Sequence, residues 1–244
     1  MFEIVRQFLL NLQNICFPIT CYNCGKIVDS EGLCQECWKK IRWIGDPKCK
    51  ICGVPFEIDA CALCPNCLRK KPHFDRAVSV FEYDSFSKIM ILKFKHGDKT
   101  HICRQLSTWM YRVAQDAIKN ADVIIPVPIH FLKRLKRKYN QSELLARELG
   151  KLSGIPYEPR ILQKEKPTPQ QEGLSRNMRL KNINGSFGVD SRYFSTLFKK
   201  TVVLVDDVLT TGATINECSK ILKKHGAEKV IVLTIARVNL GGDL

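Results

Sequence analysis

Residues 201–214 constrain the fold of this chain more than any other segment of the sequence. The segment begins with an unbroken, mostly β-branched run, Thr201–Val205, which is followed by Asp206 and Asp207 and then by a loop of small residues. Such a run is typical of a strand that is buried on both faces of a parallel sheet. The amphipathic pattern that starts near Thr214 predicts a helix after the loop. We therefore expect a strand that ends in two acids, a short loop and a helix.

The loop between this strand and this helix has the composition of an anion site. Backbone N–H groups of the loop and of the helix N-terminus can face a phosphate, and threonine hydroxyls add further donors. Carboxylates at the C-terminal end of a parallel strand suit ribose hydroxyls, because ligands of open α/β sheets bind at that edge. The alternative is a strand end with two solvated acids, followed by a threonine-rich helix cap. This alternative would explain the acids alone, but it does not explain why the strand, the acids, the loop and the helix follow one another in this order. The predicted site comprises Asp206, Asp207, Thr210, Thr211, Gly212, Ala213 and Thr214.

The chain after residue 72 alternates strand-like and helix-like patterns, which predicts an α/β domain. Further buried strands are expected at Val123–Ile125 and Val230–Ile235. Gly226 is expected to end the last helix in the left-handed conformation. The polar stretch Lys164–Asn184 shows no sustained period and is predicted to be a long loop. The expected helices are Phe86–Lys95, Ile102–Lys119, Gln141–Leu152 and Thr214–His225.

Cysteines dominate the chain before residue 72. Four Cys-x-x-Cys pairs follow one another there, and this spacing lets both thiolates of a pair reach one ion from a tight turn. Redox chemistry would explain one such pair but not four in so short a region. We therefore predict a zinc-binding region at 1–72 and an α/β domain at 73–244. The predicted ligands are Cys21, Cys24, Cys34, Cys37, Cys49, Cys52, Cys64 and Cys67.

The order of these pairs leaves two arrangements open. The spacing of the first two pairs nearly recurs in the last two, which favours a duplicated module with one Zn²⁺ in each copy. In the cross-braced alternative, the first and third pairs share an ion. In either arrangement, Cys61 is a spare cysteine that could replace Cys64. Closed coordination by four cysteines leaves no position for catalysis, and so short a region cannot bury enough core without metal. Both ions are therefore predicted to be structural.

Charge and hydropathy indicate the kind of partner and the compartment. The formal net charge is +15 at pH 7, which favours an anionic substrate or partner. No stretch reaches the roughly 20 apolar residues of a membrane-spanning helix. The N-terminus has apolar residues at helical spacing and resembles a short amphipathic helix more than an export signal. We expect a cytoplasmic protein whose cysteines bind metal rather than form disulfides.

The string at 202–214 resembles the signature of phosphoribosyltransferases of type I, which use 5-phosphoribosyl 1-pyrophosphate. The resemblance implies that Asp206 and Asp207 hold the ribose 2′ and 3′ hydroxyls and that Thr210–Thr214 cradles the 5-phosphate. Mg²⁺ would bridge the pyrophosphate and the ribose, and the reaction would displace pyrophosphate at the anomeric carbon. Val127 and Pro128, after the strand at 123–125, would belong to the pyrophosphate loop.

Other motifs narrow the resemblance. They are Phe74–Ala77, Tyr139–Gln141, Thr168–Gln171, Gly173–Arg176, Arg179, Asn182 and Gly185–Phe187. Together with the cysteine pairs, these motifs make the chain similar to the ComF (ComFC) family associated with bacterial competence. Lys138 stands where that family usually has glycine. The family implies handling of incoming single-stranded DNA on the cytoplasmic side, beside a helicase-like partner. It also implies a hood over the acceptor, expected at Phe74–Phe94 with Lys93 and Lys95, and a lid at Lys164–Asn184.

A basic segment lies close to the predicted pyrophosphate loop. Its charges could contact pyrophosphate, DNA phosphates or both, and phosphate contacts would make binding weaken with salt. A solvated basic helix face is the alternative. Bases would need exposed aromatic side chains for stacking, and Phe131 and Tyr139 are candidates, whereas Trp38 and Trp43 are expected to pack around the zinc modules. The basic residues are Lys133, Arg134, Lys136, Arg137 and Lys138.

Three hypotheses follow from the sequence. The first is an active phosphoribosyltransferase that acts on an unidentified acceptor. The second is an accessory protein of natural transformation that binds 5-phosphoribosyl 1-pyrophosphate and assists the handling of single-stranded DNA. The third, a zinc-held scaffold with a relic site, is least favoured, because the groups that a ligand needs are all retained. No histidine or glutamate has a spacing that marks it as a catalytic base, so the sequence leaves open whether transfer occurs.

Overall fold

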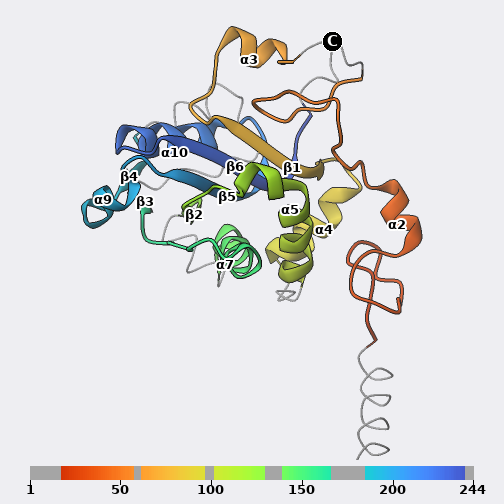
Figure 1. The fold of residues 1–244 in the computed structure, drawn as a ribbon. Coiled ribbons are helices and arrows are strands. Elements are labelled where there is room, and N and C mark those ends of the chain that lie inside the picture. Colours follow the sequence, from red (N-terminus) through yellow and green to blue (C-terminus); the bar gives the residue numbers. More distant parts are fainter. Residues whose placement is uncertain (1–17, 58–61, 97–101, 130–138, 166–184, 240–244) are drawn as a thin grey trace, which may run out of the picture.

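The computed structural model describes residues 18–57, 62–96, 102–129, 139–165 and 185–239. The strands are β1 (Arg76–Glu82), β2 (Val123–Pro126), β3 (Leu162–Lys164), β4 (Phe187–Val189), β5 (Thr201–Leu209) and β6 (Lys229–Arg237). Four of them form a parallel sheet in the order β1-β6-β5-β2, and β3 and β4 form a separate antiparallel pair (Figure 1). The parallel sheet of the predicted α/β domain is confirmed.

The described helices belong to both regions of the chain, and those of the α/β domain cover both faces of the sheet. They are α2 (Gln35–Lys40), α3 (Pro65–Arg69), α4 (Ser87–His96), α5 (Ile102–Ile118), α7 (Gln141–Ser153), α9 (Phe194–Leu197) and α10 (Ala213–Lys224), with a 3₁₀ turn at Ser191–Tyr193. Helices α5 and α7 cover one face, and α10 covers the other. Each of the four expected helices is present within a residue or two of its predicted ends. Gly226 has a φ of 101°, as expected of a glycine after a helix.

The continuous apolar run of β5 is explained by this layered arrangement. Val203 and Val205 pack in the core that contains α5 and α7, and Val202 and Leu204 pack in the core that contains α10. Successive side chains of a strand point to opposite faces, so a strand covered on both sides must be apolar at every position. Burial of each such side chain contributes about 1.5–3 kcal/mol, which fixes β5 at the centre of the fold.

The structure corrects two expectations. Strand β5 does not end at the acids but continues to Leu209, because Val208 and Leu209 still pair with β6. Residues 76–82, which fall in the segment expected to form the acceptor hood, are instead the edge strand β1, so the hood prediction is wrong for them. This edge strand was missed because its sequence, RAVSVFE, has neither a sustained apolar run nor strict alternation.

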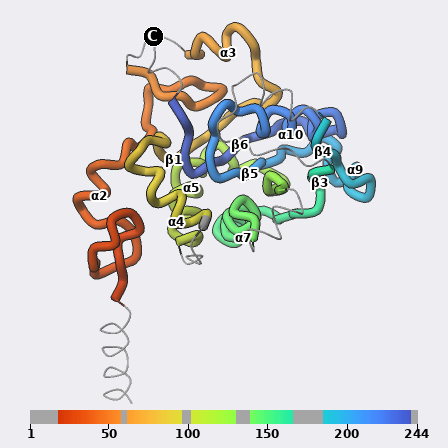
Figure 2. Tube along the Cα trace, turned by 180° about the vertical axis from the view of Figure 1, so that it is seen from behind, coloured from red at the N-terminus to blue at the C-terminus, as the bar shows by residue number. Residues whose placement is uncertain are grey.

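The zinc-binding region runs along the free edge of β1 (Figure 2). The backbone N–H of Ile44 donates to Val80 O at 3.0 Å, and the N–H of Ala77 donates to Ile51 O at 2.6 Å. Trp43 forms an isolated antiparallel bridge with Phe81. An exposed edge strand can pair with other chains, and this segment covers it. The two regions of the sequence therefore share one structural unit.

An aromatic cluster joins the first zinc module to the α/β domain. The ring centroids of Trp38 and Trp43 are 4.3 Å apart, and those of Trp43 and Trp109, on α5, are 5.3 Å apart in an edge-to-face arrangement. Trp43 also meets Phe81 edge to face at 5.9 Å. Such pairs contribute about 0.5–1.5 kcal/mol beyond the area that they bury. The predicted packing is confirmed for Trp43, whereas Trp38 contacts Trp43 and Trp109 but stays 46% exposed.

Several expectations fall on residues that the structure does not describe. They concern the N-terminal amphipathic helix, the basic segment Lys133–Lys138, nearly all of the lid at Lys164–Asn184, and Cys61. In the described ranges, every helix is too short or too polar to cross a bilayer.

Candidate functional site

The C-terminal ends of β2 and β5 form the topological switch point of the sheet. The chain continues from β2 to α7 on one face, and from β5 to α10 on the other. Ligands of open α/β sheets bind where two neighbouring connections diverge in this way, and we call this place between the ends of β2 and β5 the crevice. β2 ends at Pro126, opposite Val205, so β2 does not extend alongside Asp206 and Asp207. The residues predicted from the sequence on both strands meet at this crevice.

The two acids at the crevice have different partners. The Ser142 hydroxyl, at the start of α7, donates to Asp206 Oδ1 at 2.8 Å, and the backbone N–H of Asp207 donates to the same oxygen at 2.9 Å. Asp207 Oδ2 lies 2.9 Å from the Lys95 Nζ at the end of α4. Asp206 is thus held by α7, which follows β2 in the chain, and Asp207 by α4, which precedes β2.

Burial makes the charge of this acid pair costly. Removal from water, followed by the Asp207 carboxylate beside it, raises the pKa of Asp206 to about 7. Burial lowers the pKa of Lys95, but the Asp207 and Asp206 carboxylates more than reverse this, and the net direction is upward. The crevice therefore contains one carboxylate paired with a cation and a second that titrates near neutral pH.

The predicted phosphate loop links β5 to α10. Gly212 precedes the helix with a φ of 74°, the left-handed region that glycine adopts without strain. A Cβ there would come no closer than 3.7 Å to Leu209 Cδ1, so the backbone angle, not crowding by the protein, requires glycine. No side chain caps α10, which leaves N–H groups of its first turn for an anion. Thr210, Thr211 and Thr214 are half-buried at this loop.

The predicted pyrophosphate loop begins on the other side of the crevice. Val127 is buried, and its N–H donates to Val205 O at 2.8 Å. Its carbonyl accepts from Asn140 Nδ2 at 3.1 Å, and Asn140 Oδ1 in turn accepts from Ser142 N at the start of α7. Pro128 is half-buried beside it. Asn140 therefore joins this loop to the helix that holds Asp206.

Sequence reasoning assigned no role to Asn140, Ser142 or the ion pair of Lys95. The signal for Asn140 was present, since asparagine before an amphipathic run is a preferred N-cap. Ser142 and Lys95 had no such signal, because their contacts with the acids depend on how the helices pack.

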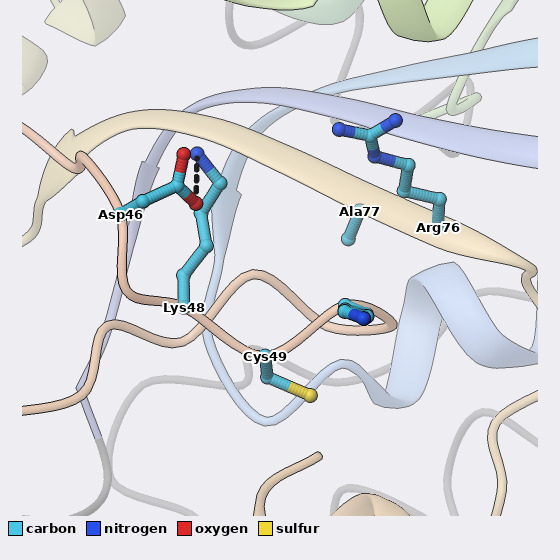
Figure 3. Close-up of a pocket in the computed structure, with 6 residues that line it drawn as sticks. Asp46, Lys48, Cys49, Arg76 and Ala77 are labelled. Carbon is cyan, nitrogen blue, oxygen red and sulfur yellow. Dashed lines mark ion pairs between the residues drawn. The ribbon is translucent and has the colours of Figure 1, made fainter. Parts of the chain in front are cut away.

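A separate hollow lies beside the second zinc module, at the N-terminal end of β1 (Figure 3). Lys48 Nζ and Asp46 Oδ1 form an ion pair there at 3.4 Å. The hollow is at the opposite edge of the sheet from the acids, so it does not belong to the candidate site. Its lining residues are Asp46, Lys48, Cys49, Lys50, Arg76 and Ala77.

The eight predicted zinc ligands form two clusters. Within each cluster the four sulfur atoms lie within 4.8 Å of one another. The Cys24 and Cys34 sulfurs are 3.8 Å apart in the first, and the Cys52 and Cys64 sulfurs are 3.6 Å apart in the second. A tetrahedral ion with Zn–S bonds of about 2.3 Å requires sulfur separations near 3.8 Å, so both donor sets fit Zn²⁺. The clusters are Cys21, Cys24, Cys34 and Cys37, and Cys49, Cys52, Cys64 and Cys67.

The clusters confirm the duplicated arrangement, and the cross-braced alternative is wrong. Each module repeats the same local contacts. Cys34 N donates to Cys21 Sγ at 3.3 Å in the first, and Cys64 N donates to Cys49 Sγ at 3.4 Å in the second. Bridges between Thr20 and Ile27 and between Lys48 and Pro55 enclose the two knuckles at equivalent positions. Both sites are closed by four thiols, as expected of structural zinc.

The modules differ in exposure. In the first, Cys24 is exposed and Cys34 is half-buried, whereas in the second only Cys52 is not fully buried. The buried Arg237 of β6 donates through Nη1 to the carbonyl of Cys52. Four thiolates around Zn²⁺ leave two negative charges, and this guanidinium offsets part of them. The second module is thus better shielded from solvent than the first.

Comparisons with known proteins identify both the zinc-binding region and the α/β domain. Residues 12–68 match the double zinc ribbon domain, and residues 142–242 match the phosphoribosyl transferase domain. Competence protein F of Haemophilus influenzae is 35% identical over 228 residues, which cover 91% of this chain and 98% of that protein. DNA utilization protein YhgH of Salmonella typhimurium is 27% identical over 211 residues, which cover 84% of this chain and 90% of that protein.

Among solved structures, the allosteric regulatory enzyme of purine biosynthesis is similar with a TM-score of 0.40 and 22% identity. The match covers 59% of this chain and 30% of that one. The domain matches and the two cysteine clusters identify a phosphoribosyltransferase-like α/β fold preceded by a double zinc ribbon.

Proposed function

Because this chain belongs to the ComF family, we propose that it is a competence-associated protein that binds 5-phosphoribosyl 1-pyrophosphate in the crevice between β2 and β5. The acid pair followed by the loop Thr210–Thr214 and the uncapped start of α10 is the observation that carries this proposal. The names of the relatives, which mention competence and DNA utilization, support a cytoplasmic role with single-stranded DNA during natural transformation.

Each part of the ligand has a matching group at the crevice. The carboxylates of Asp206 and Asp207 would accept hydrogen bonds from the ribose hydroxyls. N–H groups and hydroxyls of Thr210–Thr214 would donate to the 5-phosphate, and the loop at Val127 and Pro128 would approach the pyrophosphate. Mg²⁺ fits such a site because it takes few protein ligands and favours phosphate oxygens.

Calorimetry with 5-phosphoribosyl 1-pyrophosphate and Mg²⁺ tests the ligand. The doubly substituted protein, Asp206→Asn with Asp207→Asn, should bind at least about 100-fold more weakly than wild type, since two charge-assisted hydrogen bonds are lost. Asp116→Asn, an exposed carboxylate on α5, is the matched control and should bind like wild type. Equal affinity of the double variant, or no binding by wild type, would refute the proposed ligand.

The proposed DNA role depends on the basic segment. The test neutralises four of its basic residues, Lys133, Arg134, Lys136 and Arg137. This change should weaken oligonucleotide binding and reduce its salt dependence, because a protein that makes fewer phosphate contacts releases fewer counterions from the DNA when it binds. Neutralising four exposed lysines elsewhere controls for net charge. Equal loss in both proteins would show that only net charge acts, and would contradict the role of this segment. A helicase-like competence protein is the proposed partner. The control lysines are Lys70, Lys71, Lys224 and Lys229.

A second candidate function is an active phosphoribosyltransferase of nucleotide metabolism with an unidentified acceptor. The intact acid pair and phosphate loop favour it, because a protein that only bound DNA would not need both. The test adds nucleobases to the protein with 5-phosphoribosyl 1-pyrophosphate and measures released pyrophosphate. Release by wild type that is absent in Asp206→Asn would support transfer. Binding without any such release across the common nucleobases would support the accessory role.

A further inference from the structure

Lys95 lies at the acid pair in a way that surface lysines do not. Its side chain is 21% exposed and that of Asp207 is 16% exposed, and their charged atoms are 2.9 Å apart. Lysine is rarely buried unless it is paired, and removing both charges from water costs several kcal/mol per ion before their attraction offsets it. A buried ion pair of this kind therefore adds little to the stability of the fold, and its presence suggests a role at the site.

The last turn of α4 is held in place at three successive residues. Lys93 Nζ donates to Asn23 O in the first zinc knuckle at 2.6 Å. Tyr139 Oη donates to Phe94 O at 3.1 Å, and Gln141 Nε2 donates to Lys95 O at 3.0 Å. Carbonyls at the end of a helix have no partner within it, so the bonds to Phe94 O and Lys95 O fix backbone that would otherwise fray, and Lys93 ties the same turn to the knuckle.

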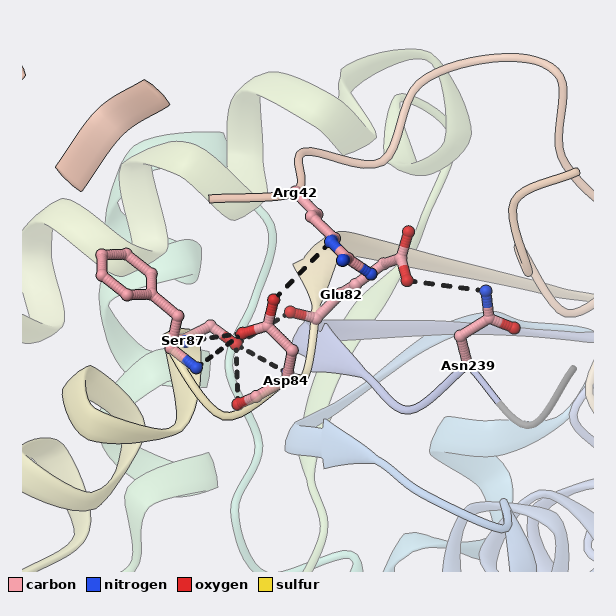
Figure 4. A network of polar contacts seen from close by, with 6 residues as sticks. Arg42, Glu82, Asp84, Ser87 and Asn239 are labelled. Atoms are coloured by element: carbon pink, nitrogen blue, oxygen red, sulfur yellow. Dashed lines mark hydrogen bonds and ion pairs between the residues drawn. The ribbon is translucent and has the colours of Figure 1, made fainter. Parts of the chain in front are cut away.

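The start of α4 is fixed as well (Figure 4). Asp84 Oδ1 accepts from Ser87 N at 2.7 Å, and Ser87 Oγ accepts from Asp84 N at 2.9 Å, which together form a capping box. Ser87 Oγ also donates to Glu82 O, at the end of β1. Arg42 of the zinc-binding region lies 3.9 Å from Asp84. Both ends of α4 are thus anchored, and the Lys95 ammonium is placed before any ligand arrives.

From this geometry we propose that Lys95 is a positioning residue of the crevice, which keeps the acid pair charged and oriented so that it can accept ribose hydroxyls. This inference rests on the proposed ligand and adds a residue to its site. An ammonium has three donors, so Lys95 can keep one bond to Asp207 while it turns another toward the anionic ligand.

The groups that face the acid pair limit what else can set its charge. Lys95 comes from α4 and Cys218 from α10, while Tyr83, after β1, interacts with Lys95 itself. Burial raises the pKa of the Cys218 thiol, so this group stays neutral near pH 7. Within the described residues, Lys95 is the cation bound to the pair. Removing it should make the two carboxylates compete for a proton.

Carbon-13 titration of the aspartate carboxyls in the free protein is the first test, and it needs no ligand. Lys95→Met keeps the apolar stem, and it should raise the titration midpoint of the acid pair by about one pH unit or more. Lys95→Arg should stay close to wild type, because it keeps the charge. Lys88→Met, an exposed lysine on the same helix, is the control. An unchanged midpoint in Lys95→Met would overturn the proposal.

Binding of 5-phosphoribosyl 1-pyrophosphate with Mg²⁺ at several pH values is the second test. Relative to wild type at the same pH, Lys95→Met should bind at least tenfold more weakly at pH 6.5 and should recover as the pH rises. Tighter binding by Lys95→Met at every pH would mean that Lys95 blocks the site, which also overturns the proposal. If wild type binds no ligand, the proposed function fails, while the carboxyl titration still decides whether Lys95 keeps the acids ionised.

Discussion

Asp206 shows how one buried carboxyl can link the stability of the fold to pH. Its pKa of about 7 in the folded chain lies above its ordinary value of 3.8. The folded state therefore binds this proton more tightly than the unfolded state does. The free energy of unfolding contributed by this group should be highest below pH 4, fall as the pH rises, and be fully lost above about pH 7.

Asp206→Asn should remove this pH dependence. Asparagine has no charge to bury, so the variant should gain stability relative to wild type between pH 5 and pH 8, by an amount on the order of a few kcal/mol. Urea denaturation at several pH values measures the difference, with the exposed Asp116→Asn as control. Parallel stability curves for wild type and Asp206→Asn would contradict the prediction.

Two equivalent glycines of the zinc modules offer a second comparison between residues. Gly25 and Gly53 both follow a Cys-x-x-Cys pair with positive φ, 81° and 70°. A Cβ at Gly25 would meet nothing within 4 Å, whereas a Cβ at Gly53 would lie 2.6 Å from Ala77 O of β1. Only the second glycine is therefore required by close packing against the sheet.

Alanine at Gly25 should cost about 1 kcal/mol, from the backbone angle alone. Alanine at Gly53 should cost a further 1–3 kcal/mol or so, because the knuckle must move away from β1. The free energy of unfolding of the two variants, measured with zinc bound, checks the order. Equal costs would mean that the second knuckle yields without strain.

Among the elements, the two zinc modules have the same backbone plan but different surroundings. The first projects Cys24 into solvent and packs its tryptophans against α5, whereas the second is enclosed by β1, β6 and Arg237. A chelator must reach the thiolates to compete for the ion. Exposure should therefore separate the rates at which the two ions leave.

With excess EDTA, the first module should lose zinc in a fast phase and the second in a slow phase, as followed by a colorimetric zinc indicator. All three tryptophans, Trp38, Trp43 and Trp109, lie at the first module, so only the fast phase should change tryptophan emission. Cys34→Ser should abolish the fast phase, and the equivalent Cys64→Ser the slow one. A single phase, or emission that changes in the slow phase, would contradict this assignment.

For the whole molecule, the zinc-binding region serves as the covering of an edge strand. Residues 42–51 pair with β1 through Ile44, Trp43 and Ile51, and Trp43 covers Trp109. The boundary near residue 72, which follows from composition, is thus not a boundary between independent parts. We therefore expect bound zinc to stabilise the α/β domain by holding this cover in place.

A fragment of residues 73–244 should consequently be less stable than the full chain and should self-associate, because it exposes β1 and Trp109. Thermal unfolding and light scattering at several concentrations measure both effects. Full-length protein with the substitution Asp116→Asn provides a folded reference of nearly unchanged surface. A monomeric fragment with the melting temperature of the full chain would show that the cover is dispensable.

Much of this protein follows from its sequence because the signals are local. The two cysteines of a Cys-x-x-Cys pair need only a tight turn to bind the same ion. The run Thr201–Val205 buries all of its apolar side chains only when helices cover both faces of the sheet. The sequence also places Gly212 in the loop before the helix, whereas its φ of 74° is decided by the tertiary structure. Zinc ligands, central strand and phosphate loop are thus predictable from neighbouring residues alone.

The remaining features depend on segments far apart in sequence. That β1 joins the sheet and that Lys95 meets Asp207 are both decided by packing between elements. No local pattern encodes these contacts, because an ion pair or a strand pairing depends on where the partner element lies. The sequence by itself determined the chemical groups at the crevice, and only the tertiary structure decided which of them touch, since distance and burial set the charge of each.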